Sequence, residues 1–292
     1  MPTFDTPDPI LVTVELGVGD VRITASDRND TEVTVRPTDP AKKSDVTAAE
    51  QTVVEFAAGR LLIKSPKGWR RYTPRGGGES IDVQINLPAG SQVHGDAGVA
   101  ALHCAGALGE CQYTTGVGDV QVEQAGPLHL TTGIGDVSVE RASTHAQITT
   151  GSGEVRIGSV EGTVVVKGAN GDTWIGAATR DVRVVAANGG ISIDHSAASV
   201  VAKTANGDIR LGEVAGGTVV AQTALGKVDI GIREGVAAWL DLNTKFGKVF
   251  NELEVTGRPQ PGEQSVEVRA RSSFGDITIH HSVASTLAVG AA

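Results

Sequence analysis

The chain has 292 residues, of which 40% are hydrophobic, 20% are charged and only 3% are aromatic, and its formal net charge is −9. This composition is typical of a folded protein and argues against intrinsic disorder. The acidic balance also argues against a surface that binds nucleic acid over a wide footprint.

The chain starts with acids and prolines, where a secretory signal needs basic residues and then an apolar run. No stretch of about 18 apolar residues follows anywhere, so the sequence predicts no transmembrane segment. From these two features we expect a cytoplasmic protein.

Residues 1–95 predict an N-terminal β-rich cap. Alternating apolar and polar runs separated by Asp, Asn, Pro and Gly are typical of a small antiparallel sheet. Such a cap would cover the end of the repeats that follow, because exposed strand edges recruit other chains. The runs lie at 10–16, 20–25, 31–35, 52–56, 60–64 and 81–87.

The segment 64–78 of this cap holds five basic residues and two aromatic residues but no acid. One interpretation is that it binds an anionic partner, either nucleic acid, lipid head groups or an acidic protein surface. The alternative is that the segment folds back onto the acidic edge of the protein itself. The candidate binding residues are Lys64, Lys67, Trp69, Arg70, Arg71, Tyr72 and Arg75.

A repeat follows between residues 98 and 277, where ten copies of one short signal recur at steps close to 18 residues. The signal is Gly or Asn, one variable residue, Gly, an acid, and Val or Ile, as in Gly116–Val120. Self-similarity at this period is typical of a β-solenoid. Apolar residues two and four positions after the second glycine, such as Val120 and Val122, predict a strand with one buried face.

The predicted fold is therefore an all-β, single-stranded β-helix with about 18 residues per coil, for which we expect a right-handed coil. Residues 96–283 would form about ten coils, and 284–292 would be a loose tail. The stretch 251–265, which contains Pro259 and Pro261, is interpreted as an insertion before one last coil.

Two columns of side chains are expected at the corner of each coil. The acids Asp119, Asp136, Glu154, Asp172, Asp208 and Asp276 would line one edge, and the hydroxyls of Thr115, Thr132, Thr150, Thr204, Thr223 and Thr244 would form a structural ladder. A calcium ladder would need Gly-Gly-x-Gly-x-Asp on a nine-residue period, but here the period is double. We therefore interpret the acids as turn residues and expect no metal and no cofactor.

The remaining reactive residue types show no catalytic arrangement. Cys104 and Cys111 have neither zinc-site nor redox-motif spacing, and their places in the repeat predict two buried small side chains. Ser152 lies at a repeat corner and not on a nucleophile elbow. The seven histidines show no helical pairing typical of a metal site. No catalytic residue is assigned.

The middle coils offer a candidate interface. Val165, Val201 and Val220 occupy outward positions beside valines that point inward, so their strands are apolar on both faces. A face of this kind is expected to be covered by the cap, by the 251–265 insertion or by a second copy in a homodimer. Trp174 and Trp239 are also expected to point outward and to belong to the same contacts.

Four parts of the chain together carry a family resemblance. They are Val18–Arg28, Pro66–Tyr72, the Thr-Gly-x-Gly-Asp-Val coils, and Ser273–Ile279. They resemble an actinobacterial branch of the putative-adhesin family of β-strand-repeat proteins of unknown function, over nearly the whole chain. The resemblance implies a single-stranded β-helix and supplies no catalytic residues. The coil length is also similar to that of the polymerising bactofilins.

The function expected from the sequence is that of a non-enzymatic binding or scaffold protein, which acts through protein–protein contact, self-association included. Two alternatives stay open. One is a polysaccharide-active β-helix enzyme, which needs a groove with carboxylates on adjacent coils. The other is a bactofilin-like polymer.

Overall fold

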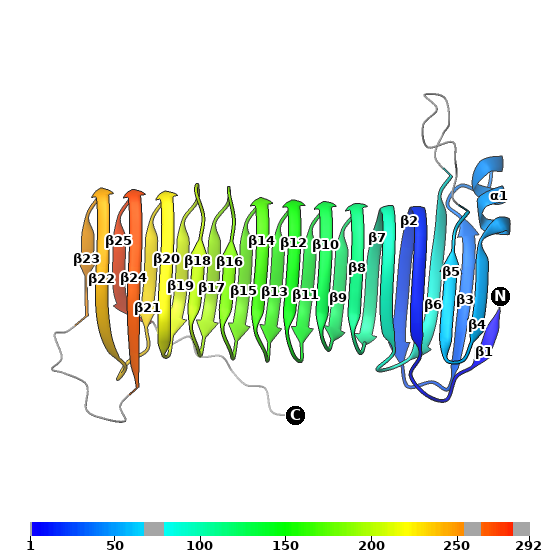
Figure 1. The fold of residues 1–292 in the computed structure, drawn as a ribbon, viewed down its shortest axis with the longest axis horizontal. Coiled ribbons are helices and arrows are strands. Elements are labelled where there is room, and N and C mark those ends of the chain that lie inside the picture. Colours follow the sequence, from blue (N-terminus) through cyan, green and yellow to red (C-terminus); the bar gives the residue numbers. More distant parts are fainter. Residues whose placement is uncertain (1, 67–78, 254–263, 283–292) are drawn as a thin grey trace. The chain divides into compact units, whose positions relative to one another are not determined.

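The computed structural model describes residues 2–66, 79–253 and 264–282. The chain divides into two compact units, residues 1–171 and 172–292. Each unit is built of β-solenoid coils, in which most strands pair in parallel with the equivalent strand of the next coil (Figure 1). The predicted all-β solenoid is confirmed.

Unit 1 carries one helix among its described residues. Its elements are β1 (Thr3–Asp5), β2 (Leu11–Ser26), β3 (Asp30–Pro37), α1 (Lys43–Gln51), β4 (Val53–Ala57), β5 (Arg60–Lys64), β6 (Ile81–Pro88), β7 (Gln92–Ala107), β8 (Cys111–Val117), β9 (Val120–Ala125), β10 (Leu128–Ile134), β11 (Val137–Ala142), β12 (Ala146–Ser152), β13 (Val155–Val160) and β14 (Val164–Asn170).

Unit 2 is built of strands over its described part. They are β15 (Thr173–Ala178), β16 (Val182–Val185), β17 (Ile191–Ser196), β18 (Val200–Lys203), β19 (Ile209–Val214), β20 (Gly217–Leu225), β21 (Val228–Ile232), β22 (Ala237–Phe246), β23 (Val249–Asn251), β24 (Ser265–Phe274) and β25 (Ile277–His281).

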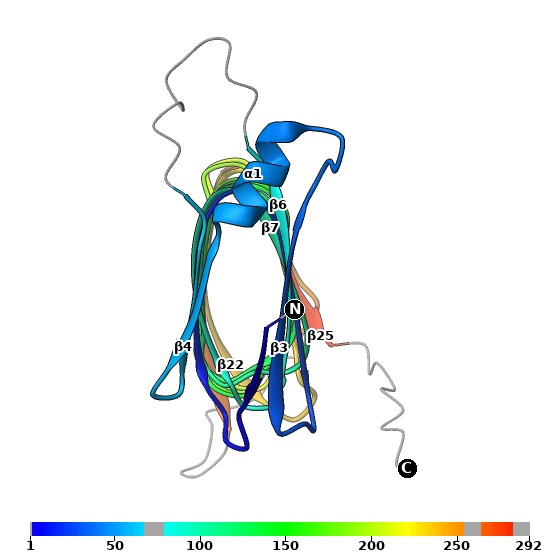
Figure 2. The ribbon, with the colours of Figure 1, turned by 90° about the vertical axis from the view of Figure 1, so that its right-hand side faces the viewer.

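Each regular coil contributes one strand to each of two ladders that face each other. In unit 1 one ladder runs β8–β10–β12–β14 and the other runs β9–β11–β13 (Figure 1). The end-on view shows the two sides of the coil facing each other (Figure 2). Alternate residues of each strand point between the ladders and are buried there, for example Leu128, Leu130, Val137 and Val139, each at most 1% exposed. The period-two pattern therefore identified the core correctly.

The corner of each coil depends on glycine. Gly153 has φ +145°, and a Cβ at this position would lie 2.0 Å from the carbonyl oxygen of Gly135 in the preceding coil. Only glycine adopts this backbone conformation without strain. Corner threonines bind carbonyl oxygens of a neighbouring coil, because the Thr132 hydroxyl donates to the carbonyl oxygen of Gly118 at 3.3 Å, and Thr244 donates to that of Gly275 at 2.9 Å. Thr150 is an exception, since its hydroxyl is buried without a hydrogen-bond partner.

The acidic column has a structural use. Asp119 Oδ1 accepts the backbone N–H of Asp136 at 2.9 Å, and Asp136 Oδ1 accepts that of Glu154 at 2.7 Å. In unit 2, Asp172 Oδ1 accepts the N–H of Gly190 at 2.7 Å. These three carboxylates bind the turn of the next coil, which supports their interpretation as turn residues, whereas Glu154 Oε1 accepts a hydrogen bond from Arg156 at 2.6 Å.

The N-terminal strands mix both kinds of pairing. β1–β3, β3–β6 and β4–β5 are antiparallel, whereas β2 pairs in parallel with β5, β6 and β7. β2 is itself a coil with a glycine corner, since Gly19 has φ +147°. The sequence pattern gave no sign of α1, which has a weak apolar face and buries only Asp45 and Ala48.

The C-terminal coils of unit 2 do not follow chain order. β24 pairs with β20 on one side and with β22 on the other, and β25 likewise lies between β21 and β23 (Figure 1). The expectation that residues 265–281 form the last coil is therefore wrong. The layer of β22 and β23 stands last, because the chain skips one layer after β21 and then returns.

Candidate functional site

The basic segment 64–78 follows β5 in the chain and precedes β6, and its first residues, Lys64 and Ser65, are bound to β2. Lys64 Nζ lies 2.6 Å from Glu15 Oε2. Ser65 donates its N–H to the carbonyl oxygen of Glu15 at 2.9 Å, and its hydroxyl oxygen accepts the N–H of Gly17 at 3.0 Å. Lys64 therefore pairs with a carboxylate of the protein itself. Lys67, Trp69, Arg70, Arg71, Tyr72 and Arg75 lie outside the described residues, so their binding role stays a prediction.

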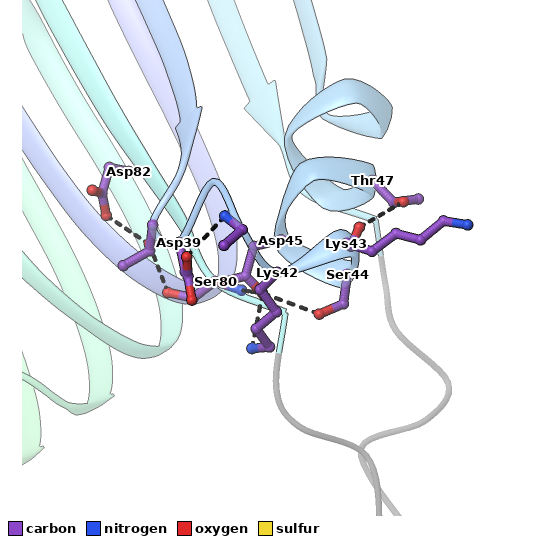
Figure 3. A network of polar contacts seen from close by, with 10 residues as sticks. Asp39, Lys42, Lys43, Ser44, Asp45, Thr47, Ser80 and Asp82 are labelled. Carbon is purple, nitrogen blue, oxygen red and sulfur yellow. Dashed lines mark hydrogen bonds and ion pairs between the residues drawn. The ribbon is translucent and has the colours of Figure 1, made fainter.

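Ser80, two residues after this segment, is held by a polar network at the start of α1 (Figure 3). Asp45 is only 2% exposed, and its Oδ1 accepts hydrogen bonds from Ser80 N–H at 3.3 Å and from Ser44 Oγ at 3.2 Å, with Lys42 Nζ at 2.9 Å. Burial raises the pKa of Asp45, but Lys42 and these hydrogen bonds lower it by more, so the net pKa lies below the usual value. The network fixes Ser80 to α1.

A cavity of about 630 Å³ lies beside Ser65 and Pro66, on the outer face of β2, β7 and β8. Glu15 and Asp96 line it and are register neighbours on adjacent strands. His94 lines it too, and the Nε2 atom of His94 is buried without a hydrogen-bond partner, 3.9 Å from Glu110 Oε1. The volume falls within the range of small-molecule sites. A pair of carboxylates on adjacent coils is what the enzymatic alternative requires.

A second hollow, which we call the corner groove, has a volume of about 470 Å³. It lies beside Ser80 and follows the corner of the coils. Its apolar side is the corner ridge, which we define as Val99, Val117 and Ile134, with exposed fractions of 46%, 42% and 59%. The three residues are register neighbours on β7, β8 and β10. Thr38, Ser80 and Asp82 line the groove as well, and the Thr38 hydroxyl donates to Asp82 Oδ1 at 2.8 Å.

Sequence reasoning missed the corner ridge. Val117 and Ile134 occupy the variable position just before the second glycine of the repeat, and Val99 occupies the same position before Ala100, which replaces that glycine. A solvated turn residue is expected there. The available signal was that successive copies carry Val, Val and Ile at this position. Three exposed β-branched side chains at one corner are an unusual choice for a turn that faces only water.

The predicted interface residues are divided between the two units. In unit 1, Val165 is half-buried beside Gln147. In unit 2, Val201 and Val220 are register neighbours on one ladder, and Arg183 and Arg269 flank them.

The two tryptophans lie elsewhere in unit 2. Trp174 is on the other ladder, where its Nε1–H donates to Asp194 Oδ2 at 3.1 Å. Trp239 lies on β22, in the outermost layer of unit 2, and is 58% exposed. The role of all five residues in an interface stays a prediction.

The two cysteines are buried and free, as predicted. The contact with Cys111 and the apolar surroundings both raise the pKa of the Cys104 thiol well above its ordinary value. A buried thiol in this state is a poor nucleophile. Within 2–66, 79–253 and 264–282, no group of three or more His, Cys, Asp or Glu side chains could hold a metal ion. No helix in these ranges is long and apolar enough to span a membrane.

Comparison with known proteins gives one family match and several matches to solved structures. The family model described as Toastrack DUF4097 matches residues 12–288. A Bacteroides fragilis structure described as a putative adhesin is 14% identical, with 95% of this chain and 96% of that chain covered and a TM-score of 0.38. A Parabacteroides distasonis structure described as a putative lipid binding protein is 14% identical, with coverages of 94% and 95% and a TM-score of 0.42. A search of curated proteins finds no match.

Proposed function

The chain belongs to the Toastrack DUF4097 family, and from this premise we propose that it is a non-enzymatic binding protein that acts through protein–protein contact at the corner groove of unit 1. The observation that carries the proposal is the corner ridge, whose three apolar side chains are each more than two-fifths exposed. Contiguous exposed apolar side chains with a polar rim are typical of protein interaction sites.

The rim of the groove indicates the chemistry of the partner. Asp20, Asp82 and Asp119 line the groove together with the corner ridge. An apolar strip edged by carboxylates fits a partner segment with apolar side chains next to Lys or Arg. The acidic net charge of the whole chain, −9, would speed the approach of a basic partner.

The proposal is tested with the double variant Val117→Ser/Ile134→Ser. Partners captured from the native cytoplasm by the wild type would be purified, and their affinities for both proteins measured by calorimetry. We expect at least about a tenfold loss for the double variant, since each removed contact contributes about 1–2 kcal/mol at an interface.

The control is Leu225→Ser, because Leu225 occupies the equivalent corner position in unit 2 and is 53% exposed. This control should bind like the wild type. Equal affinities for the double variant and the wild type would overturn the proposal.

A second candidate function rests on the cavity. Glu15 and Asp96 stand on adjacent strands inside it, as in a polysaccharide-active β-helix, where one carboxyl group donates a proton and the other assists water or attacks the sugar. A panel of bacterial polysaccharides would be incubated with the wild type, Glu15→Gln and Asp96→Asn. The function is supported if the wild type cleaves a polysaccharide and both variants do not. If the wild type cleaves none of the polysaccharides, activity on the tested substrates is excluded.

A cytoplasmic location belongs to the proposal as well. Fractionation of the native cells, with detection of the protein in the soluble cytoplasmic fraction, is the expected result. Recovery with the cell envelope would contradict it.

A further inference from the structure

The outermost layer of unit 2, formed by β22 and β23, has an incompletely covered core. Leu240 and Leu242 point inward but are only half-buried, whereas their register neighbours on β24, Val268 and Ala270, are 0% exposed. Trp239 is 58% exposed on the outer face of the same strand. Over the described part of the chain, β22 pairs with β24 alone and β23 with β25 alone.

The backbone of β22 also has free pairing capacity. Ala237 donates its N–H to the carbonyl oxygen of Gln264 beside β24, at 3.2 Å. Because alternate residues of a strand hydrogen bond to the same neighbour, Ala238, Leu240 and Leu242 turn their N–H and C=O groups toward the open edge. An unpaired edge next to half-buried leucines is a template for another strand.

We propose that this edge pairs with the same edge of a second copy, with β22 antiparallel to β22 of the second copy about a two-fold axis at Leu242. Inward residues must oppose inward residues, so only every second register is allowed. With the axis at Leu242, Trp239 lies opposite Lys245 of the second copy, and Asp241 lies opposite Asn243.

The Trp239 side chain favours this register over its two allowed neighbours. With the axis at Asn243, Asp241 would face Lys245, but Trp239 would face Gly247, beyond the end of β22, and its ring would meet no cation. A two-fold axis at Asp241 would place the two Asp241 carboxylates, each paired with its own Arg271, opposite each other and would leave Trp239 opposite Asn243. With the axis at Leu242, no like charges are directly opposed. Each Lys245 ammonium can then lie over a Trp239 ring, an attractive cation–π contact.

The local charge suits a contact between two copies of an acidic protein. The outer layer and the residues just after it, 237–253, contain Asp241 and Glu252 against Lys245 and Lys248, a balance of zero. The whole chain carries −9. Two copies that meet at this layer therefore avoid most of the repulsion that their other surfaces would produce.

The test compares two substitutions of the same exposed tryptophan by sedimentation velocity. Trp239→Lys places a lysine opposite Lys245 and should weaken the dimer at least about tenfold. Trp239→Glu removes the same indole but faces Lys245 with an opposite charge, so it should keep most of the affinity. Trp239→Lys/Lys245→Glu should recover the affinity that Trp239→Lys loses. Equal effects of Trp239→Lys and Trp239→Glu would overturn the proposed register.

A cysteine experiment tests the same geometry independently. Trp239→Cys and Lys245→Cys proteins should form a disulfide only when they are mixed, because position 239 faces 245 and not itself. The native cysteines are buried, so they should not compete. Crosslinking of either variant alone would contradict the two-fold register.

Other occupants of the edge would give different results. If the wild type stays monomeric at its highest soluble concentration, the edge of β22 is covered within the chain. If it forms filaments, the copies associate through a head-to-tail contact and not through a two-fold dimer. Both results overturn the proposal. This contact is separate from the corner groove, so Val117→Ser/Ile134→Ser should still dimerise.

Discussion

Replacing the corner glycine Gly153 by alanine tests the physical basis of the coil. The backbone has φ +145° there, and the new Cβ would lie 2.0 Å from the carbonyl oxygen of Gly135. A non-glycine residue in such a conformation costs about 1–3 kcal/mol, and moving the neighbouring backbone out of contact costs about 1–3 kcal/mol more. We therefore expect Gly153→Ala to lower the free energy of unfolding by about 2–6 kcal/mol.

Gly168→Ala is the matched control in the same unit, because a Cβ on Gly168 meets only Thr150 Cγ2 at 3.7 Å. This change should alter stability by less than about 1 kcal/mol, and reduced freedom of the unfolded chain can make it stabilising. Urea unfolding followed by circular dichroism measures both variants, and thermal unfolding of Gly153→Ala should shift down by about 5–15 °C. If Gly153→Ala is no less stable than Gly168→Ala, the corner does not require glycine and the reasoning is wrong.

Three further changes probe single contacts. Asp136→Ala should lose about 1 kcal/mol, because it leaves the Glu154 N–H without its carboxylate, whereas Asp136→Asn should keep most of the stability; urea titration separates them. Thr132→Val should cost about 1 kcal/mol through the lost bond to Gly118, and an unchanged urea midpoint would contradict a structural role for the hydroxyl. Asp45 has a lowered pKa in the folded state, so its contribution is present above the unfolded value of about 4 and is lost as pH falls through the folded pKa. Asp45→Asn should therefore reduce the acid-induced loss of stability in unfolding curves measured from pH 7 to pH 2, and identical slopes would refute this assignment.

The regular coils could be predicted because one local rule repeats in them. A glycine that tolerates positive φ, an acid that binds the next turn and a threonine that binds a corner carbonyl recur together, as at Gly135, Asp136 and Thr132. α1 could not be predicted in the same way. It is held mainly through Asp45, whose partner Ser80 is distant in sequence and cannot be recognised from a local pattern.

The order of the last coils was hidden for a related reason. Residues of β22 and β24 carry the same alternation, so either strand fits against β20 by its pattern alone. One clue was that Lys248 stands where most coils have an acid, while Asp276 keeps its acid and binds the Lys248 N–H at 2.8 Å. The corner groove was missed because its polar side comes from Thr38 and Asp82, which lie outside the repeat.

The stacking of β24 between β20 and β22 sets a condition on synthesis of the protein. Along the described chain, β22 gains its strand partner only from residues 265–274, which leave the ribosome after it. The earlier coils can be added one after another as the chain emerges, but this last part has to wait and then close in a single step. A chain truncated after β23 would lack β24, the strand that pairs with β22 among the described residues.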